Sequence, residues 1–318
     1  MRSLNRSCCE LFAVVLLFAT SVSMAKTETA EEREAAFPPQ GVYLGTETCT
    51  ECHEGYVEQL RQDPHGQTTD TRTPMANDGC EACHGPGEQH MENVSEDKDG
   101  GLIAFAGGRA EALLENRMCL QCHQGGALIH WQSSLHAGED LACTACHHIH
   151  TPSPVLDRTT QTEVCVRCHG DIRADIYRAS THPIREANVI CSDCHNAHGS
   201  AGPAGLNELS VNENCYRCHA ELRGPFLWEH YPVSEDCSLC HRVHGSNHAA
   251  LLTKTAPFLC QQCHQDVRAQ GRQHVSRLFD FDFSDTRRRP RFILGEGCMN
   301  CHPQVHGSNH PSGAALMR

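Results

Sequence analysis

Apolar residues are concentrated at one place near the start of the chain and scattered through the rest of it. Residues 11–22 form an almost unbroken apolar run that follows the basic residues Arg2 and Arg6 and precedes the small residue Ala25. The run is too short for a transmembrane helix, which needs about 20 residues. A basic segment, a short apolar run and a small residue are typical of a signal peptide. We expect residues 1–25 to be a signal peptide, with a retained membrane anchor as the alternative.

Beyond this run, no apolar stretch is long enough to span a bilayer. Residues 26–40 are rich in Glu and predict a flexible leader. The pattern between residues 100 and 118 predicts a helix over Arg109–Asn116. The rest of the chain divides near its middle, and we expect two halves, residues 41–178 and 179–318.

The candidate chemistry lies in the cysteines. The chain has 22 Cys, and all except Cys8 and Cys9 fall into ten copies of Cys-x-x-Cys-His. The motif cysteines are Cys49, Cys52, Cys80, Cys83, Cys119, Cys122, Cys143, Cys146, Cys165, Cys168, Cys191, Cys194, Cys215, Cys218, Cys237, Cys240, Cys260, Cys263, Cys298 and Cys301. The motif histidines are His53, His84, His123, His147, His169, His195, His219, His241, His264 and His302.

Cys-x-x-Cys-His is the attachment signature of c-type haem. The two sulfurs bind one edge of the porphyrin, and the adjacent His ligates iron from the proximal face. A single Cys-x-x-Cys would more often indicate zinc, a redox dithiol or a disulfide. Because all ten copies carry the following His, the sequence predicts ten covalently bound haem c groups. Such attachment takes place outside the inner membrane, so it agrees with a signal peptide and predicts a periplasmic protein.

Composition indicates how such a chain folds. Aromatic residues make up only 5% of it, so side chains alone supply little apolar surface for a core. The porphyrins must therefore form most of the core, and the bonds to haem cross-link the chain as disulfides would. We expect a multihaem cytochrome c with mainly short α-helices and loops wrapped around ten haems and almost no sheet. Without haem, we expect the polypeptide to be disordered.

The remaining histidines form an internal repeat. The chain has 24 His, and the ten motifs fall into five consecutive pairs. An intervening His follows the first motif of each pair by 10 to 13 positions, and a trailing His follows the second by 3 to 6. The intervening histidines are His65, His136, His182, His230 and His274. The trailing histidines are His90, His150, His198, His244 and His306. Four are left over, namely His130, His148, His248 and His310.

These ten histidines are candidate distal ligands, one for each iron. A trailing His lies too close in sequence to its own motif to reach the far face of that haem, so it must serve another haem. An intervening His is favoured to cap the first haem of its own pair, and any of the ten could instead be an ordinary surface His. Iron with two His ligands is six-coordinate and has no open site for a substrate. The pattern therefore favours electron transfer over catalysis.

The net charge of the chain limits the classes of partner it can bind. The formal net charge of −13 makes nucleic acid an unfavourable partner. Basic residues are almost all Arg, whose planar guanidinium binds carboxylates in a bidentate way and suits haem propionates. The run from Arg287 to Arg291 is either a solvated loop or a docking surface.

Several long stretches resemble the periplasmic decahaem cytochromes of the MtrA/DmsE type. They are CEACHGPGEQH from Cys80, CSDCHNAHGS from Cys191, NENCYRCHAELRGPFLWEH from Asn212 and the final CMNCHPQVHGSNHPSG. The resemblance covers nearly all of the chain after residue 25. It implies an elongated, nearly linear wire of bis-His haems. Nine of the ten candidates fall where the family places distal ligands, whereas His274 matches less closely because the last pair has a longer insert.

The resemblance also implies partners. They are an outer-membrane β-barrel porin that sheathes the wire, a periplasmic or inner-membrane cytochrome that exchanges electrons with it, and an extracellular multihaem cytochrome. The alternatives are a soluble periplasmic electron shuttle and a multihaem reductase with an open haem. Relatives work in metal reduction, in metal oxidation and in related respiration, so the sequence leaves the direction of electron flow open.

Overall fold

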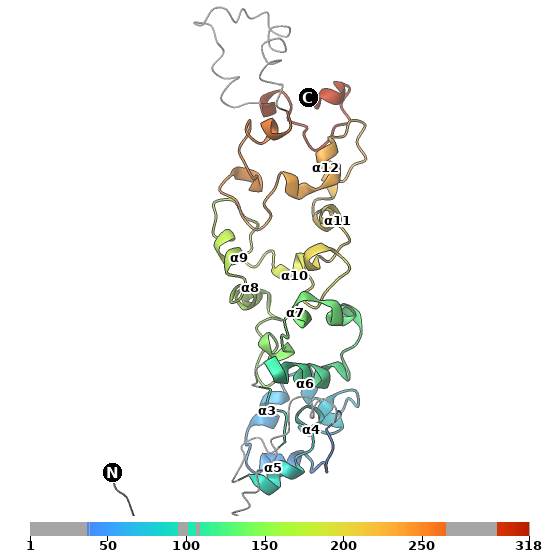
Figure 1. Ribbon diagram of the computed structural model, residues 1–318, viewed down its shortest axis with the longest axis vertical. Helices are drawn as coiled ribbons and strands as arrows, with labels where there is room; N and C mark the ends of the chain where they lie inside the picture. Colours follow the sequence, from blue (N-terminus) through green and yellow to red (C-terminus); the bar gives the residue numbers. More distant parts are fainter. Residues whose placement is uncertain (1–36, 38, 95–100, 106–108, 265–297, 318) are drawn as a thin grey trace, which may run out of the picture.

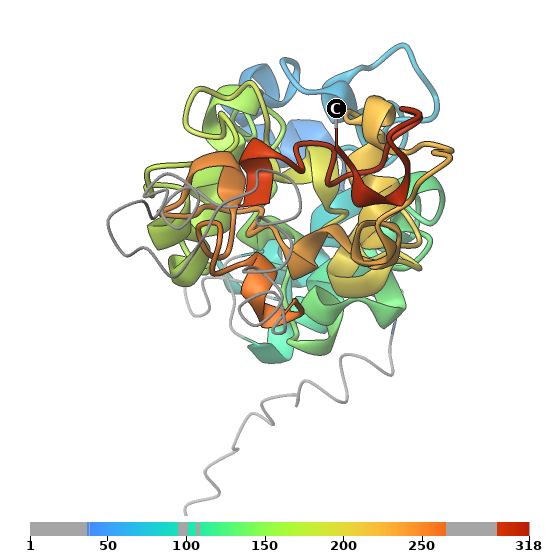
Figure 2. The same ribbon diagram turned by 90° about the horizontal axis from the view of Figure 1, so that it is seen from above.

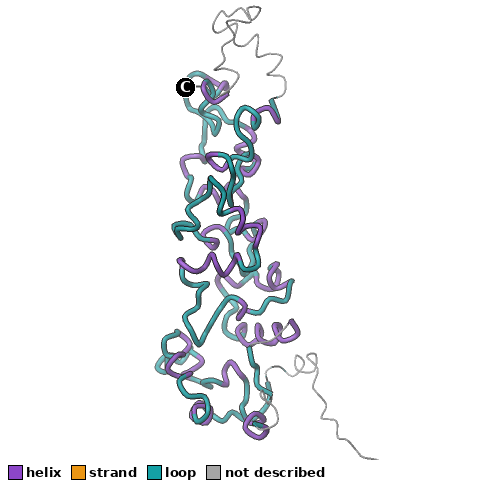
Figure 3. The backbone as a smooth tube through the Cα atoms, turned by 90° about the vertical axis from the view of Figure 1, so that its left-hand side faces the viewer, coloured by secondary structure: helices purple, strands orange, loops and turns teal. Residues whose placement is uncertain are grey.

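The computed structural model describes residue 37 and residues 39–94, 101–105, 109–264 and 298–317. These residues form a long column in which the chain climbs from one end to the other in sequence order (Figure 1). A view at right angles shows the same elongated shape (Figure 3). Seen along the long axis, the described segments have a roughly round outline (Figure 2). The expected elongated arrangement is therefore confirmed.

The helices of the described residues are short, as the composition predicts. The α-helices are α2 (Thr46–Thr50), α3 (Tyr56–Leu60), α4 (Glu81–His84), α5 (Glu88–Asn93), α6 (Arg109–Leu120), α7 (Leu135–Gly138), α8 (Arg158–Val166), α9 (Gly170–Asp175), α10 (Cys191–Cys194), α11 (Val211–Tyr216) and α12 (Tyr231–Glu235). The longest, α6, contains the predicted helix Arg109–Asn116 and extends it by one turn.

Single 3-10 turns connect these helices. They are η1 (Pro64–Gly66), η2 (Pro74–Ala76), η3 (Gly126–Leu128), η4 (Trp131–Ser133), η5 (Cys143–Ala145), η6 (Pro203–Gly205), η7 (Ala220–Leu222), η8 (Cys237–Leu239), η9 (Ala249–Leu251), η10 (Cys260–Gln262), η11 (Cys298–Asn300) and η12 (Gly313–Ala315). Within the described ranges there is no β-strand, and β-type pairing is limited to isolated bridges. Among those residues no helix is long and apolar enough to cross a membrane.

Each Cys-x-x-Cys-His motif folds into one helical turn. In all ten motifs the His backbone N–H donates to the carbonyl oxygen of the first Cys, at 2.8 to 3.1 Å. This i to i−4 bond is the repeating unit of an α-helix. Side-chain hydrogen bonds cap the N-termini of some helices. At the start of α11, the Ser210 hydroxyl accepts a bond from the backbone N–H of Glu213. The short elements therefore follow from the motifs themselves.

Buried apolar side chains are few and scattered along the column. They are Leu60, Ile103, Ala112, Met118, Trp131, Val164, Val166, Ile176 and Ile190. Large apolar side chains such as Leu135, Leu209 and Leu227 are at least 75% exposed to solvent. A column this poor in apolar packing agrees with a fold whose core is not made of side chains.

Candidate haem sites and their histidines

The two motifs of each pair lie side by side at their first cysteines. The side chain of Cys119 lies against that of Cys143, and the side chain of Cys165 lies against that of Cys191. The same contact joins the first cysteines in the other three pairs, Cys49 with Cys80, Cys215 with Cys237 and Cys260 with Cys298. These sulfurs stand in for the thioether sulfurs of the haem-bound protein. The five-pair organisation expected from the sequence is thus present in space.

Asparagine side chains hold the two motifs of a pair together. Asn116 accepts a hydrogen bond from the backbone N–H of Cys143 at 2.7 Å and donates to the carbonyl oxygen of Leu141 at 2.8 Å. Asn212 accepts from Cys237 at 2.8 Å in the same way. Each of these asparagines lies three positions before the first Cys of its pair. The amide therefore fixes the start of the second motif beside the first.

Nine motif histidines each face one candidate distal His. The opposed pairs, in order of the motifs, are His53 with His90, His84 with His150, His123 with His65, His147 with His198, His169 with His136, His195 with His244, His219 with His182, His241 with His306 and His264 with His230. Their ring centroids lie 5.8 to 6.4 Å apart.

This separation fits an iron atom between the two rings. Two metal–imidazole bonds of about 2 Å each place the nitrogens about 4 Å apart, and the ring radii bring the centroids to about 6 Å. The nine opposed pairs match this value. The four leftover histidines are absent from these pairs. The residues present therefore fit bis-His iron, and the ligand roles themselves stay predictions.

The intervening histidines correct one expectation. We expected each to face the first motif His of its own pair, but His65, His136, His182 and His230 each face the first motif His of the next pair. The physical reason is that consecutive pairs stack along the column, so a side chain between two motifs lies beside the following pair. His274 lies outside the described residues.

Four of the trailing histidines face the preceding pair of motifs. His150, His198, His244 and His306 each face the second motif His of the preceding pair, and His90 faces His53 within the first pair. The expectation that a trailing His faces a motif other than its own agrees with this placement. Each junction between consecutive pairs therefore consists of one intervening His reaching forward and one trailing His reaching back.

At the three later junctions these two histidines are also joined through the backbone. The Nδ1 atoms of His136, His182 and His230 bond to the carbonyl oxygens of Ala197, Val243 and Val305, at 2.9, 3.0 and 3.1 Å. Each acceptor is the residue just before the trailing His of the next pair. Because Nδ1 must donate to a carbonyl, the proton lies on Nδ1 and the Nε2 lone pair is free for metal.

We call this carbonyl bond to Nδ1 the backbone clasp, and at the junctions of His182 and His230 a Gly-Ser dipeptide after the trailing His reinforces it. Ser246 and Ser308 exchange backbone hydrogen bonds with Ser180 and Trp228, each two positions before an intervening His. The glycine before this Ser lets the two segments approach, since a Cβ on Gly307 would overlap the ring of Phe226. The clasp thus holds both ligand candidates of a junction in one unit.

Motif histidines in the later part of the chain use the same type of support. His195 and His241 bond through Nδ1 to the carbonyl oxygens of Ala204 and Ala250, at 3.1 and 2.8 Å. His84 does so with Ile103, at 2.8 Å. His302 bonds through Nδ1 to the carbonyl oxygen of Ala315 at 2.5 Å. A neutral backbone acceptor is therefore the usual partner of Nδ1 in this protein.

The first junction is built differently. His65 bonds through Nδ1 to the carboxylate of Asp63 at 2.5 Å. The Nδ1 atom of His150 is buried without a hydrogen-bond partner, and that of His90 is in the same situation. Thr151 follows His150 where the later junctions have glycine. Sequence reasoning missed Asp63, although a carboxylate two positions from a candidate ligand was a readable signal.

Burial keeps several of these histidines neutral. Desolvation holds the pKa of each below the ordinary value of 6.5, and neighbouring imidazoles lower most of them further. The six are His84, His147, His150, His198, His244 and His306. Neutral imidazole is the form that binds metal.

Another polar group that sequence reasoning missed braces the column between its third and fourth pairs. Asp175, at the end of α9, bonds to Arg178 at 2.7 Å and to Arg242 at 2.9 Å, and only 10% of its side chain is exposed. Burial alone would raise the pKa of this carboxyl, but the hydrogen bonds from Arg242 and Arg178 outweigh burial and hold it below 3.8. The predicted signal peptide and the segment from Arg287 to Arg291 lie outside the described residues.

Within the described ranges, no three His, Cys, Asp or Glu side chains converge as a cluster that could hold a metal ion without haem. The repeated haem-attachment turns and the opposed histidines, carried on short helices, define a multihaem c-type cytochrome, a class that transfers electrons. Two family patterns match the chain. The doubled CXXCH motif matches residues 182–224 and 230–269, and the NrfB-like cytochrome c-type protein family matches residues 80–161.

More narrowly, the chain belongs to the MtrA family of multihaem cytochromes. It is 43% identical over 280 residues to the multiheme cytochrome MtrA of Shewanella baltica (strain OS185), an alignment that covers 86% of this chain and 81% of that protein. The resemblance stated from the motifs is thereby confirmed. The protein is an electron carrier with several covalent haem c groups.

Proposed function

We propose that this protein is a wire of ten bis-His haems that carries electrons between the periplasm and the cell surface through an outer-membrane β-barrel. One observation carries the proposal. The opposed histidines are linked forward and backward from each pair to the next, along the length of an elongated column (Figure 1). Such interleaving supports a single linear path rather than a cluster.

The ten motifs would supply the thioether bonds and the proximal ligands, and the opposed histidines would supply the distal ligands. Bound haem c supplies one-electron chemistry, Fe(III) to Fe(II). In seven of the nine opposed pairs an Nδ1 hydrogen bond orients one of the two imidazoles, which would leave its Nε2 for the metal. For His302, the candidate distal ligand remains His274. With two histidines holding each iron, no iron would offer a site for substrate, and this supports an electron carrier over a reductase.

The shape supports the barrel. A thin column with little buried apolar packing and several exposed loops would need insulation from lipid, since lipid-exposed irregular backbone is unfavourable within a bilayer. A closed barrel around the column supplies that insulation. In this proposal the protein sits in the periplasm at the outer membrane. One end exchanges electrons with a periplasmic or inner-membrane cytochrome, and the other exchanges them with an extracellular multihaem cytochrome.

The test is electron transfer across a sealed membrane. The mature holoprotein, whose mass should correspond to ten haems, is reconstituted with its outer-membrane barrel in liposomes that enclose an electron acceptor. We expect external reductant to reduce the acceptor only when both proteins are present. His230→Ala should slow this transfer, and His130→Ala, which changes a leftover His, should not. Absence of conduction together with a free holoprotein that does not bind the barrel would leave a periplasmic shuttle as the function.

A further inference from the structure

Asp63 is an exception among the groups that support the intervening histidines. Three of the four described intervening histidines bond through Nδ1 to a neutral backbone carbonyl, whereas His65 bonds to a carboxylate. All four face a motif His at a similar separation, 5.8 Å for His65 and His123. The first site therefore differs from the other three in the charge on the Nδ1 partner of its intervening His.

The local geometry fixes Asp63 against the ring. Asp63 caps the 3-10 turn η1, and its Oδ1 accepts a bond from the backbone N–H of His65 at 2.9 Å as well as the contact from the ring. Pro64 lies between the two residues and restricts the backbone. The side chains are 20% and 30% exposed, so solvent reaches neither fully. The carboxylate is thus held on one ring atom by the fold.

A carboxylate on Nδ1 makes the imidazole a stronger donor to the metal than a carbonyl does. Extra donation and nearby negative charge both favour Fe(III) over Fe(II), and hydrogen bonding around an axial ligand is one of the ways a protein sets haem potential. We propose that Asp63 is a positioning residue that makes the haem held by His65 and His123 the lowest in potential among the four haems held by intervening histidines. This inference rests on the proposed ligand roles.

The transfer itself stays a one-electron step. A haem held by His65 and His123 would exchange one electron at a time with its neighbours, and Asp63 would keep its hydrogen bond from Nδ1 throughout. A haem of low reduction potential near one end of the column would give one electron-transfer step a different free energy from the others. Its place in the first junction also puts it close to that end (Figure 1).

The experiment is a potentiometric titration of the full holoprotein and its variants. Asp63→Asn keeps an oxygen acceptor but removes the charge, which converts the first junction to the neutral type. We expect one haem of the ten to become at least tenfold easier to reduce, a shift of about 59 mV or more for a one-electron couple. Asp63→Glu restores the carboxylate and should return the potential toward the native value.

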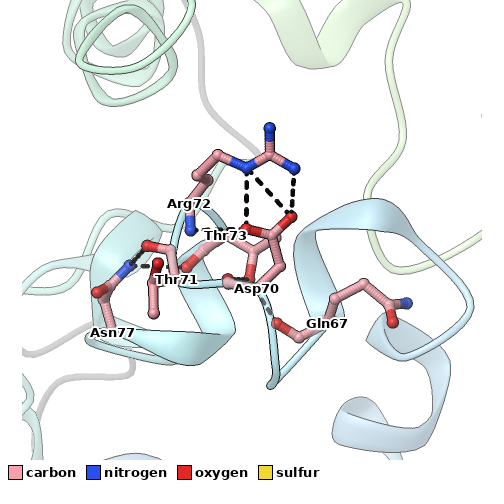
Figure 4. Close-up of polar contacts among 6 residues, drawn as sticks. All are labelled: Gln67, Asp70, Thr71, Arg72, Thr73 and Asn77. Carbon is pink, nitrogen blue, oxygen red and sulfur yellow. Dashed lines mark hydrogen bonds and ion pairs between the residues drawn. The ribbon is translucent and has the colours of Figure 1, made fainter.

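Asp70→Asn is the matched control. Asp70 lies in the loop after His65 and binds Arg72, with Nη2 to Oδ2 at 2.7 Å, rather than a candidate ligand (Figure 4). The substitution Asp70→Asn removes the same charge a few residues from Asp63 and should leave all haem reduction potentials unchanged. An equal shift in Asp63→Asn and Asp70→Asn would overturn the proposal, because general surface charge would then explain it.

A third variant separates this inference from the function on which it rests. His65→Ala should produce one high-spin haem by electron paramagnetic resonance. If that signal fails to appear, the ligand role of His65 is wrong and the proposed function needs revision. If it appears but the potential in Asp63→Asn does not move, the ligand role stands and only the proposal about Asp63 fails.

Discussion

The first junction between consecutive motif pairs and the three later junctions support their intervening histidines with different groups. At each, an intervening His faces forward and a trailing His faces back. The later junctions support the intervening His with a backbone carbonyl of the clasp. The first supports it with the side chain of Asp63, and it leaves Nδ1 of His150 without a partner.

The difference shows which parts of the geometry depend on side chains. A carbonyl acceptor is present whatever residue supplies it, so Ala197, Val243 and Val305 can differ while the bond stays the same. The clasp therefore holds the candidate ligands without adding charge. The first junction uses a charged side chain, so its electrostatics can be changed by one substitution. The later junctions therefore share a neutral support for the intervening His, whereas the support at the first junction carries a charge.

The largest expected effect comes from removing an intervening His at a later junction. His230→Ala removes the ring that faces His264, and it also removes the bond to Val305 in the clasp. One iron should lose its distal ligand and become high-spin, which electron paramagnetic resonance measures directly. His130→Ala should leave the spectrum native, because His130 lies in none of the opposed pairs. Identical spectra for the two variants would contradict the assignment.

The next effect comes from filling the space at a clasp glycine. Gly307 has a φ of +127°, and a Cβ there would overlap Phe226. Gly307→Ala should lower the free energy of unfolding by about 1–3 kcal/mol through backbone strain. At the first junction, Thr151→Ala should change it by less than about 0.5 kcal/mol, since Thr151 is exposed. Denaturant titrations of both holoproteins test the contrast, and equal losses would show that the clasp is not special.

A smaller effect is expected where Asp175 braces the third and fourth pairs. Asp175→Asn removes its charge-assisted bonds to Arg178 and Arg242, and Arg242 is half exposed. The free energy of unfolding should fall by about 1–2 kcal/mol at neutral pH. Glu163→Gln, at the exposed pair with Arg173, is the matched control and should cost less than about 0.5 kcal/mol.

The sign of the pH dependence follows from the lowered pKa of Asp175. A carboxyl with a lowered pKa in the folded state stabilises the protein above its unfolded pKa, near 3.8, and loses that contribution as pH falls through the folded pKa. The difference in stability between native protein and Asp175→Asn should therefore be constant from neutral pH down to about 4 and shrink below it. A difference that persisted in full at pH 2 would show that charge is not the cause.

Local features of the fold could be predicted from the sequence because they depend on neighbouring residues. The helix over Arg109–Asn116 is part of α6, and the motifs form single turns closed by their own i to i−4 bonds. The near absence of sheet followed from the scarcity of apolar and aromatic residues. The pairing of motifs could also be predicted from the sequence, since the spacing of cysteines and histidines repeats. The division into halves at residue 178 stays a prediction.

The motif His that each intervening His faces could not be predicted from such local patterns. His65 lies 58 positions from His123, and His136 lies 61 positions from the carbonyl of Ala197. Contacts at that distance depend on how the pairs stack, which no local pattern specifies. The carbonyl acceptors are invisible in a sequence because every residue has one. The Gly-Ser after His198, His244 and His306 was the available signal, and Thr151 after His150 marked the exception.

The central claim is that every iron in this wire has two histidine ligands, and the spin state of the native holoprotein tests it most directly. Electron paramagnetic resonance of the fully oxidised protein, with signals integrated against total haem, counts six-coordinate and open irons separately. The account predicts only low-spin ferric haem, because nine opposed histidine pairs fit iron and His274 is the candidate for the tenth. A high-spin signal that integrates to one or more haems per protein would contradict the account and favour a reductase with an open site.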